Sequence, residues 1–306
     1  MTGLSLVTGG AGFVGRHLVK ALRNRGERAR SFDLAAATSD DEVQGSILDE
    51  DALVAAMVRV ETVFHLAGNA QLWARVASVF EEVNHVGTRR VIAAAKRAGV
   101  KRLVHCSSLT TLVGSGAPIG ASNADEETMR TEADMLGSYP LSKLRAELAV
   151  KSAADEGLDA VIAIPTEPLS ANDDSLTPPT QMILDFANGK TPAYIDCILN
   201  FVPVKNLADG LIATRDNGKS GERYLLGGEH GPARLLALIE TKTGTPAPKT
   251  KMLLGRARRR NRRYRACIRD YARKPPKAPL TGVRLAGRQV SFSSEKTARD
   301  LGWRAA

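Results

Sequence analysis

Short apolar runs alternate with stretches of helical periodicity over the first 165 residues. A buried strand needs only a short apolar run, whereas an amphipathic helix repeats its apolar side chains every three or four positions. Strands that alternate with helices are typical of a doubly wound parallel sheet, so we predict an α/β fold. The pattern predicts strands at 4–7, 29–32, 61–68, 100–108 and 160–164, a helix from Phe13 to the stop signal at Gly26, and helices at 49–57, 79–98 and 139–155.

A glycine-rich turn joins the first predicted strand to the first predicted helix. Its glycines are Gly9, Gly12 and Gly15. Phe13 and Val14, which begin the predicted helix, lie between the second and third of them. At these places glycine permits a tight turn, a close approach of a pyrophosphate to the backbone, and close packing of the helix on the strand. The helix N-terminus would face the phosphates with its free N–H groups. The turn therefore predicts a dinucleotide site.

An acidic residue ends the second predicted strand. Asp33 lies about 20 residues beyond the glycines, where a carboxylate accepts hydrogen bonds from both adenosine ribose hydroxyls. A carboxylate at this place repels a 2′-phosphate, so it favours NAD over NADP. Other candidates for the same site, at the carboxyl ends of predicted strands, are Gly68, Ser108 and Pro165.

A tyrosine and a lysine begin the predicted helix at 139–155. Tyr139 and Lys143 are four residues apart and share one helix face, and Pro140 fits a first helical turn. A cation beside a tyrosine favours the phenolate, so we expect the pKa of Tyr139 to be lowered from about 10. Tyr139 can then act as an acid/base, with Lys143 also bonding the nicotinamide ribose. Ser108, at the end of the strand 100–108, can donate a hydrogen bond to the same substrate oxygen.

Composition excludes several classes of protein. The chain has 306 residues, 43% of them hydrophobic and 25% charged, which is ordinary for a globular protein. Three cysteines are too few for a disulfide framework and indicate a reducing, cytoplasmic compartment. No apolar run approaches the roughly 18 residues that span a bilayer, and the N-terminus has no basic region, so we expect neither a membrane span nor a signal peptide. The five histidines have no paired spacing, so we expect no metal site, and His65 is expected to be a packed or cofactor-adjacent side chain.

The net charge of +10 is concentrated in one segment. Residues 249–277 hold thirteen Lys or Arg and one acid, a net +12, so the remainder of the chain carries −2. Tyr264, Cys267, Ile268 and Tyr271 follow the spacing of an amphipathic helix. Such a helix either packs its apolar stripe into the core or lies on an anionic membrane surface. A nucleic-acid partner is not expected, because aromatic residues are sparse and no binding motif is present.

These motifs together resemble the extended short-chain dehydrogenase/reductases, the NAD-dependent epimerase/dehydratase family, over essentially the whole chain. The later part is most similar to the branch of hopanoid-associated sugar epimerases, with dihydroflavonol reductases and 3β-hydroxysteroid dehydrogenases as neighbours. The motifs are Thr8-Gly9-Gly10-Ala11-Gly12-Phe13-Val14-Gly15, Val63-Phe64-His65-Leu66-Ala67-Gly68, Val83-Asn84-His85-Val86-Gly87-Thr88, Ser107-Ser108, Tyr139-Pro140-Leu141-Ser142-Lys143, Gly189-Lys190-Thr191-Pro192-Ala193-Tyr194-Ile195-Asp196, Leu199-Asn200-Phe201-Val202-Pro203-Val204, Gly221-Glu222-Arg223-Tyr224-Leu225-Leu226-Gly227-Gly228 and Leu280-Thr281-Gly282-Val283-Arg284.

The resemblance implies a role for each matching residue. Tyr139 is the general acid/base, Lys143 its helper, and Ser108 orients the substrate; Asn84 lies on the cofactor side, and Ser46-Ile47 stands for the family's Asp-hydrophobic pair at the adenine. The cofactor is NAD, with NADP disfavoured. The residues expected to bind it are Gly9, Gly12, Phe13, Val14, Gly15, Asp33, Ser46, Ile47, Leu66, Ala67, Gly68, Asn84, Ser107, Tyr139, Lys143 and Pro165.

The resemblance also implies a division of the chain and an assembly. Residues 1–165 and 205–226 are expected to form a Rossmann NAD-binding domain. Residues 166–204 and 227–306, including the basic segment 249–277, are expected to form a smaller substrate-binding lobe. A homodimer is expected through the helices near 79–98 and 140–156.

Enzymes with this set of catalytic and NAD-binding residues carry out three reactions: oxidation/reduction, epimerisation and dehydration. Dehydratases of the family carry an acid pair after the catalytic Ser or Thr, whereas Leu109-Thr110-Thr111 follows Ser108 here. Nucleotide-sugar epimerases of the family carry an arginine that holds the diphosphate, and residues 196–202 contain no arginine. The family's His-Val-Asp-Asp is Pro203-Val204-Lys205-Asn206 here, and its Arg-Pro is Ile164-Pro165. We therefore expect hydride transfer to or from a secondary alcohol or ketone. The alternatives are a sugar epimerase with retained NAD and a non-catalytic NAD-binding regulator. Glu167 is either a second acid/base or a loop charge.

Overall fold

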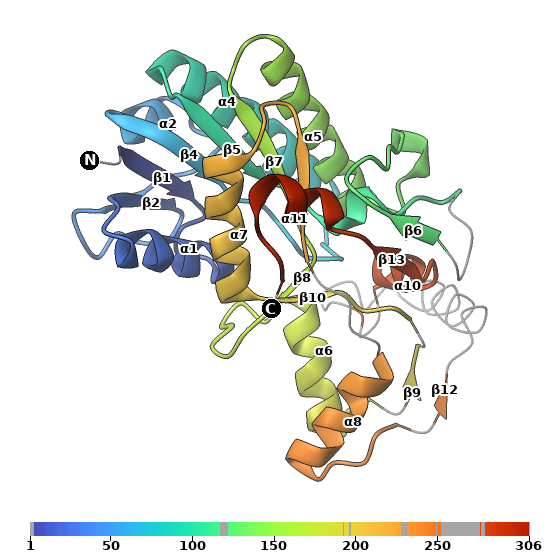
Figure 1. Cartoon of the computed structure of the whole chain (residues 1–306). Helices are drawn as coiled ribbons and strands as arrows, with labels where there is room; N and C mark the ends of the chain where they lie inside the picture. The colour runs from blue at the N-terminus through green and yellow to red at the C-terminus, as the bar shows by residue number, and fades with distance from the viewer. Residues whose placement is uncertain are drawn as a thin grey trace.

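Seven parallel strands form a central sheet (Figure 1). The computed structural model describes residues 3–116, 122–191, 193–195, 197–227, 232–248, 250–251, 276 and 279–305. The strands are β1 (Leu4–Thr8), β2 (Ala29–Asp33), β3 (Glu42–Gln44), β4 (Val60–His65), β5 (Arg102–Cys106), β7 (Ala160–Pro165) and β11 (Arg223–Leu226). Their order across the sheet is β11-β7-β5-β4-β1-β2-β3. The predicted doubly wound Rossmann fold is confirmed.

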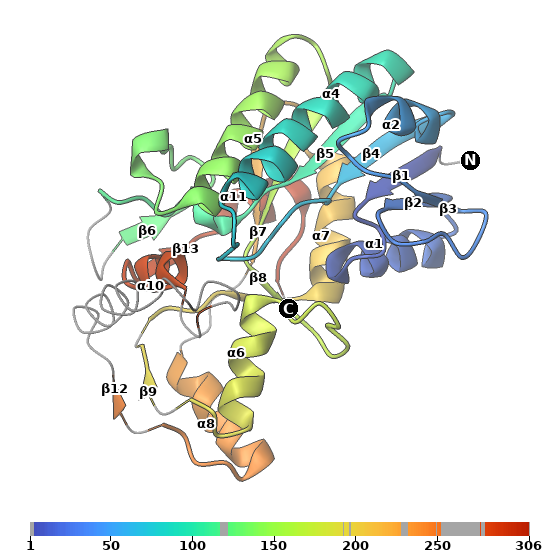
Figure 2. The same cartoon turned by 180° about the vertical axis from the view of Figure 1, so that it is seen from behind.

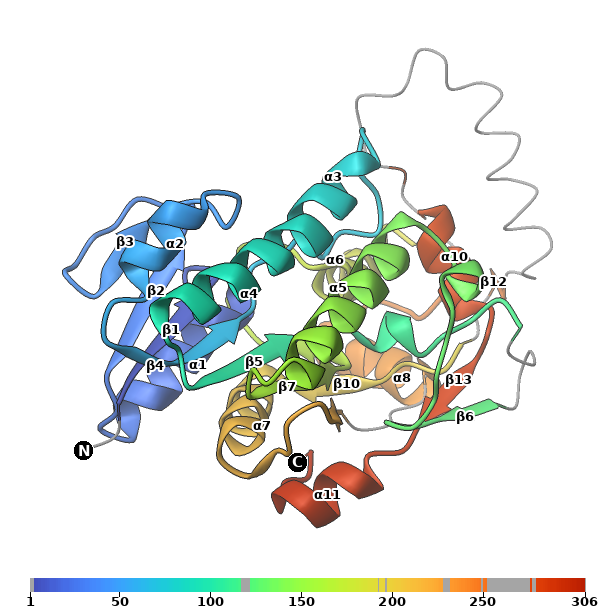
Figure 3. The same cartoon turned by 90° about the horizontal axis from the view of Figure 1, so that it is seen from above.

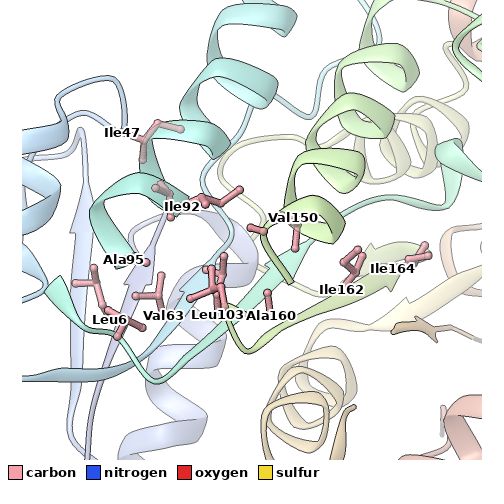
Figure 4. Close-up of a cluster of buried hydrophobic side chains, with 14 of the residues drawn as sticks. Leu6, Ile47, Val63, Ile92, Ala95, Leu103, Val150, Ala160, Ile162 and Ile164 are labelled. Carbon is pink, nitrogen blue, oxygen red and sulfur yellow. The ribbon is translucent and has the colours of Figure 1, made fainter. Parts of the chain in front are cut away.

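Helices cover both faces of the sheet, which explains why β1 and β7 are buried along their whole length rather than at alternate positions. One face carries α1 (Phe13–Asn24) and α7 (Val204–Asn217); the other carries α2 (Glu50–Ala56), α4 (Gly87–Ala98) and α5 (Ser138–Asp155) (Figures 2 and 3). All five residues of β1 and all six of β7 are buried. Figure 4 shows strand side chains such as Leu103 and Ile162 packed against Ile92 of α4 and Val150 of α5.

The helix predicted at 79–98 is divided into three parts. A short α3 (Ser78–Phe80) leads into one π-helical segment at Glu81–Val86, and α4 follows from Gly87. Hydrophobic spacing alone does not distinguish a wider turn of this kind from an α-helix. Such turns often lie at functional sites, and this one carries Asn84.

A smaller group of elements lies beyond the carboxyl ends of the strands. It contains the parallel pairs β8 (Glu167–Leu169) with β10 (Phe201–Pro203) and β9 (Ala193–Tyr194) with β12 (Thr250–Lys251). The helices α6 (Pro178–Ala187) and α8 (Pro232–Thr243) lie side by side at its far end (Figures 1 and 2). The exact division of the chain into two domains stays a prediction.

The C-terminal end of the chain packs on the large sheet rather than in the smaller lobe. The strand β13 (Val290–Phe292) pairs with β6 (Ser122–Ala124), and α10 (Leu280–Ala286) precedes it. Helix α11 (Glu295–Leu301) follows, and Leu301 and Trp303 join the core beside α7. The Trp303 indole N–H donates to the Asn206 carbonyl at 3.1 Å. The chain end therefore packs beside α7, and the assignment of 227–306 to the substrate-binding lobe stays a prediction.

Candidate active site

The glycine-rich turn is closed so tightly that side chains do not fit. Gly9 adopts φ +72°, and the Gly12 N–H donates to the Gly9 carbonyl at 3.1 Å. A Cβ on Gly15 would lie 2.0 Å from that same carbonyl oxygen. Because Gly12 is the N-cap residue of α1, no side chain caps the helix, and its first turn contains no acid. The N–H groups of Phe13 and Val14, at the N-terminus of α1, are therefore not capped by a side chain and are suited to bind a diphosphate.

The loop after β4 crosses directly over this turn. The N–H groups of Leu66 and Ala67 donate to the Thr8 carbonyl and hydroxyl, at 3.1 and 3.3 Å. A Cβ on Gly9 would lie 2.8 Å from the Ala67 nitrogen, so the two segments are in contact through their backbones. The predicted residues of both segments, with Gly68, are thus brought together at the carboxyl ends of β1 and β4.

Asp33 is held against the same turn. One of its carboxylate oxygens accepts from the Ala11 N–H at 3.1 Å and the other from the Ala35 N–H at 3.2 Å. Each oxygen keeps a lone pair for a ribose hydroxyl. The pair expected at the adenine lies after β3: the Ser46 hydroxyl accepts from the Leu48 N–H at 3.1 Å, and Ile47 is buried against Gly87.

Asn84 uses its side chain to connect two segments of the site. Its amide oxygen accepts from the Asn69 N–H at 2.7 Å, and its amide nitrogen donates to the Asn69 carbonyl at 3.1 Å and to the Ser142 hydroxyl at 3.0 Å. Asn84 is buried. Its geometry is therefore that of a brace between the loop after β4 and the helix that carries Tyr139.

Tyr139 and Lys143 lie in the first turns of α5, beside the end of β5. A hydrogen bond joins the Tyr139 hydroxyl to Ser108, and the Phe80 ring lies edge-on to the Tyr139 ring with centroids 6.0 Å apart. The Lys143 Nζ donates to the Cys106 carbonyl at 2.7 Å. The three predicted catalytic residues are thus assembled at one point. Pro165, the last residue of β7, lies at the same edge, because Cys106 is in register with Ala163.

The expected lowering of the Tyr139 pKa is wrong. Burial raises the pKa of Tyr139 to about 12, and the hydrogen bond from Ser108 only partly opposes this. Burial also lowers the pKa of Lys143, against the opposing influence of Cys106 and Glu147. Helical spacing brings the two residues onto one face, but the exclusion of water from the phenol outweighs the lysine, whose ammonium is bonded to a backbone carbonyl.

A buried carboxylate that the sequence did not single out organises the residues around Ser108. Glu147, one turn after Lys143, is 3% exposed. One of its oxygens accepts hydrogen bonds from the hydroxyls of Ser107 and, at 2.6 Å, Thr111. Arg223 of β11 lies 3.6 Å from the other oxygen. The Lys-x-x-x-Glu spacing could have pointed to it, but only the fold shows that it reaches β5.

Two buried histidines lie beneath Lys143. His65 exchanges hydrogen bonds with the hydroxyls of Thr8 at 2.8 Å and Thr88 at 3.0 Å. The His105 ring is 5.4 Å from the His65 ring, and neither of its nitrogens has a partner in the described part of the chain. Burial, reinforced by Lys143, lowers the pKa of His65 to about 3 and the pKa of His105 in the same direction.

These histidines predict a loss of stability in mild acid. In the unfolded chain His65 gains a proton below about pH 6.5, whereas in the folded protein it stays neutral down to about pH 3. The free energy of unfolding should therefore fall as pH decreases through this window, by up to about 1.4 kcal/mol per pH unit from His65. Urea unfolding between pH 7 and pH 4 measures the slope. His65→Asn should show a shallower slope than the wild type, and equal slopes would contradict the assignment.

Comparison with known proteins decides which family this arrangement represents. The model of the NAD dependent epimerase/dehydratase family matches residues 5–227. The chain belongs to this family. NAD is therefore its cofactor, and the glycine turn, the open end of α1 and Asp33 fit it. This epimerase/dehydratase-family chain is an NAD-dependent enzyme of the dehydrogenase, reductase or epimerase type.

Relatives of this family member cover nearly its whole length. It is 31% identical to the "Putative dihydroflavonol 4-reductase" of Synechocystis, over 97% of this chain and 88% of that protein. It is 32% identical to sterol demethylase protein B of Methylococcus capsulatus, over 97% and 92%. The crystal structure of gox2253 superposes with a TM-score of 0.82 at 31% identity, over 99% of this chain and 93% of the other.

The remaining expectations concern charge, metal and membrane. The basic segment 249–277 lies outside the described residues except at 250, 251 and 276, so its predicted helix stays a prediction. In the described residues, no three His, Cys, Asp or Glu side chains gather as they would around a metal ion. No described helix combines the length and apolarity that a membrane span needs.

Proposed function

We propose that the protein transfers hydride between the nicotinamide of NAD and a secondary alcohol or ketone, with Tyr139 as the acid/base. The observation that carries the proposal is the assembly of Ser108, Tyr139 and Lys143 at the carboxyl end of β5. The buried Tyr139 hydroxyl is hydrogen-bonded to Ser108, and like any phenol it is protonated at neutral pH. A protonated phenol next to a serine hydroxyl suits donation of a proton to a ketone oxygen that gains hydride.

Ser108, Tyr139 and Lys143 then have different roles in the reaction. Ser108 holds the substrate oxygen, and its own hydroxyl is oriented by Thr110 at 3.1 Å. Tyr139 supplies the proton in reduction and receives it in oxidation. Lys143, fixed on the Cys106 carbonyl, places a cation beside the phenol and is available to the ribose of the cofactor. Bound NAD supplies the hydride acceptor or donor.

Two features support an alcohol or ketone over the other reactions of the family. The residues after Ser108 are Leu109, Thr110 and Thr111, and none can serve as the acid of an elimination. Three relatives with near-complete coverage are named as a dihydroflavonol reductase, a sterol demethylase protein and a quinoline-oxide ketoreductase, and none of these names refers to a nucleotide sugar. A retained-NAD epimerase is the second candidate, because its first half-reaction needs the same residues.

Cofactor content and product analysis separate these candidates. We expect the purified protein to bind added NADH reversibly and to oxidise it stoichiometrically with a ketone substrate. Mass spectrometry of the purified protein shows whether NAD is retained, and chiral chromatography of the product shows whether a stereocentre is inverted. Inversion without net NADH consumption would establish the epimerase instead. Binding of NAD without conversion of any ketone, alcohol or sugar would indicate a regulator.

We also propose that the protein is a cytoplasmic homodimer that contacts anionic membranes through 249–277. The helices α4 and α5 pack together on one face of the sheet, and Leu148 of α5 is 44% exposed there. The net +12 of 249–277 supplies attraction to anionic lipid. Light scattering tests the homodimer, and a monomeric mass would contradict it. Salt-dependent co-sedimentation with phosphatidylserine vesicles tests the membrane contact, and sedimentation equal to that with neutral vesicles would contradict it.

A further inference from the structure

The segment that carries the catalytic serine is anchored to a buried acid of α5. Ser108 precedes a 3₁₀ turn at Leu109–Thr111, and the Thr111 N–H closes this turn on the Ser108 carbonyl at 3.1 Å. The Thr111 hydroxyl donates to Glu147 Oε1 at 2.6 Å, and the Ser107 hydroxyl donates to the same oxygen. The chain is therefore held by one carboxylate both before and after Ser108.

A buried arginine fixes this carboxylate from its other side. Arg223 Nη1 lies 3.6 Å from the second oxygen of Glu147, and the two side chains are only 12% and 4% exposed. Arg223 is itself held in place, because its guanidinium donates to the Thr128 carbonyl at 2.9 Å. A carboxylate with hydroxyl donors on one oxygen and a guanidinium beside the other has little freedom to move. Glu147 thus connects the helix of Tyr139 with β11 and with the serine segment.

Glu147 also places a negative charge beside the catalytic lysine. Lys143 and Glu147 are four residues apart, so they share the face of α5 that carries Tyr139. The Lys143 ammonium donates to the Cys106 carbonyl, which is a neutral group. A charge one helical turn away acts more strongly in a buried site than at the surface, because less water screens it. Glu147 supports the protonated lysine against burial, which lowers the pKa of Lys143.

The ionisable groups of the sheet that face Lys143 are uncharged at neutral pH. Cys106 and His105 lie on β5, and His65 lies on β4. Burial raises the pKa of the Cys106 thiol and lowers the pKa of both histidines. Among the described side chains that face Lys143, Glu147 therefore supplies the negative charge.

Acids on other elements near α5 have other partners. Glu81 of the π-helical segment and Glu132, which lies before α5, both pair with Arg145, at 3.1 and 2.6 Å. Glu167, beyond the end of β7, accepts from the Asn200 N–H at 3.0 Å. Burial raises the pKa of Glu167 to about 7, so its titration falls in the neutral part of a pH profile and not in the alkaline part.

We propose that Glu147 is a positioning residue of the active site. Its buried carboxylate holds the segment 107–111 so that the Ser108 hydroxyl points at Tyr139. The same carboxylate supplies the negative charge that faces the Lys143 ammonium. The inference rests on the proposed function, in which Ser108 orients the substrate oxygen and Lys143 supports the phenolate that forms when Tyr139 gives up its proton.

Removal of the charge of Glu147 should move the alkaline limit of ketone reduction, the pH above which kcat falls. Burial raises the pKa of Tyr139 to about 12 and lowers the pKa of Lys143, so Lys143 loses its proton first as the pH rises. Without a negative charge nearby, the neutral amine is favoured further. Glu147→Gln, which keeps an oxygen for the two hydroxyls, should therefore shift the limit to lower pH by at least about 0.5 unit.

Two further variants separate the position of the carboxylate from its charge. Glu147→Asp keeps the charge but withdraws it by one methylene from the hydroxyls, so kcat should fall at least about tenfold while the alkaline limit stays in place. Thr111→Val removes one hydroxyl at a fully buried position, keeps the ion pair with Arg223, and should also lower kcat without moving the limit. The NADH affinity of each variant shows whether its fold is intact.

Chemical labelling of Lys143 measures the same effect without turnover. Acetic anhydride reacts with neutral amines, so the pH dependence of Lys143 acetylation follows the loss of its proton. Peptide mass spectrometry measures this labelling against the exposed Lys20 in the same sample, with no ketone added. We expect the labelling curve of Glu147→Gln to lie at lower pH than that of the wild type, in step with the kinetic limit.

Glu126 provides the matched control. It is also 3% exposed, and its carboxylate accepts from the Leu225 N–H at 3.2 Å and the Thr297 N–H at 3.1 Å, between β11 and α11. Glu126→Gln should leave kcat, the alkaline limit and the labelling curve unchanged. An unshifted limit and labelling curve in Glu147→Gln, or wild-type kcat in Thr111→Val, would overturn the proposal. Absence of ketone reduction by the wild type would instead contradict the proposed function, and the labelling would still test Glu147.

Discussion

Replacement of Tyr139 by Phe is expected to lower kcat for ketone reduction by about 10²- to 10⁴-fold, the usual contribution of a positioned acid. The substitution removes the hydroxyl that is bonded to Ser108 but keeps the ring, which packs edge-on against Phe80. The affinity for NAD and the folded structure should change little. The measurement is the steady-state rate of NADH oxidation, with KM for the ketone determined for both proteins.

A second buried tyrosine provides the matched control. Tyr224 of β11 is fully buried, and its hydroxyl accepts the Lys219 N–H at 3.1 Å, away from Ser108. Tyr224→Phe should lose about 1 kcal/mol of stability, the worth of one hydrogen bond, and keep kcat. If Tyr139→Phe retained the wild-type rate, Tyr139 would not be the acid, and the mechanism would have to be abandoned.

Replacement of Gly15 by Ala is expected to weaken NAD binding by at least about tenfold and to lower the free energy of unfolding by about 1–3 kcal/mol, as for other overpacked sites. The added Cβ would lie 2.0 Å from the Gly9 carbonyl oxygen and 2.8 Å from the Gly10 Cα. Both are backbone atoms, so the whole glycine turn must move, and with it the N–H groups that face the diphosphate. Fluorescence titration with NADH and urea unfolding measure the two effects.

Another glycine shows what the same substitution does without a clash. A Cβ on Gly116 would meet only an Asp134 oxygen at 3.7 Å, which is an ordinary contact. Gly116→Ala should therefore leave NADH affinity and stability close to the wild type. NADH affinity of Gly15→Ala equal to that of Gly116→Ala would contradict the assignment of the glycine turn to the diphosphate.

Elements with strong local patterns were predicted close to their observed bounds. The helix predicted at 139–155 is α5 at Ser138–Asp155, and the strand predicted at 160–164 is β7 at Ala160–Pro165. Both depend on features within a few residues: Pro140 lies in the first turn of the helix, and the apolar run of the strand ends at Pro165. The π-helical turn at Glu81–Val86 was not predicted, because its spacing differs too little from that of an α-helix.

Contacts between distant segments could not be predicted in the same way. Glu147 reaches Ser107 across 40 positions, and Glu167 meets Asn200 across 33. Trp303 returns to Asn206 across 97 positions, which places the end of the chain on the large sheet. A hydrogen bond of this kind depends on strand order and helix placement, which no local pattern contains.

The sequence by itself determined the doubly wound sheet, the glycine turn with Asp33, and the spacing of Tyr139 and Lys143, because each follows from periodicity or spacing within one or two elements. Only the tertiary structure decided the direction of the Tyr139 pKa, the role of Glu147 and the surroundings of Glu167. The physical reason is that a pKa and a buried hydrogen bond depend on how completely water is excluded and on which groups replace it. Those groups come from elements far apart in the chain.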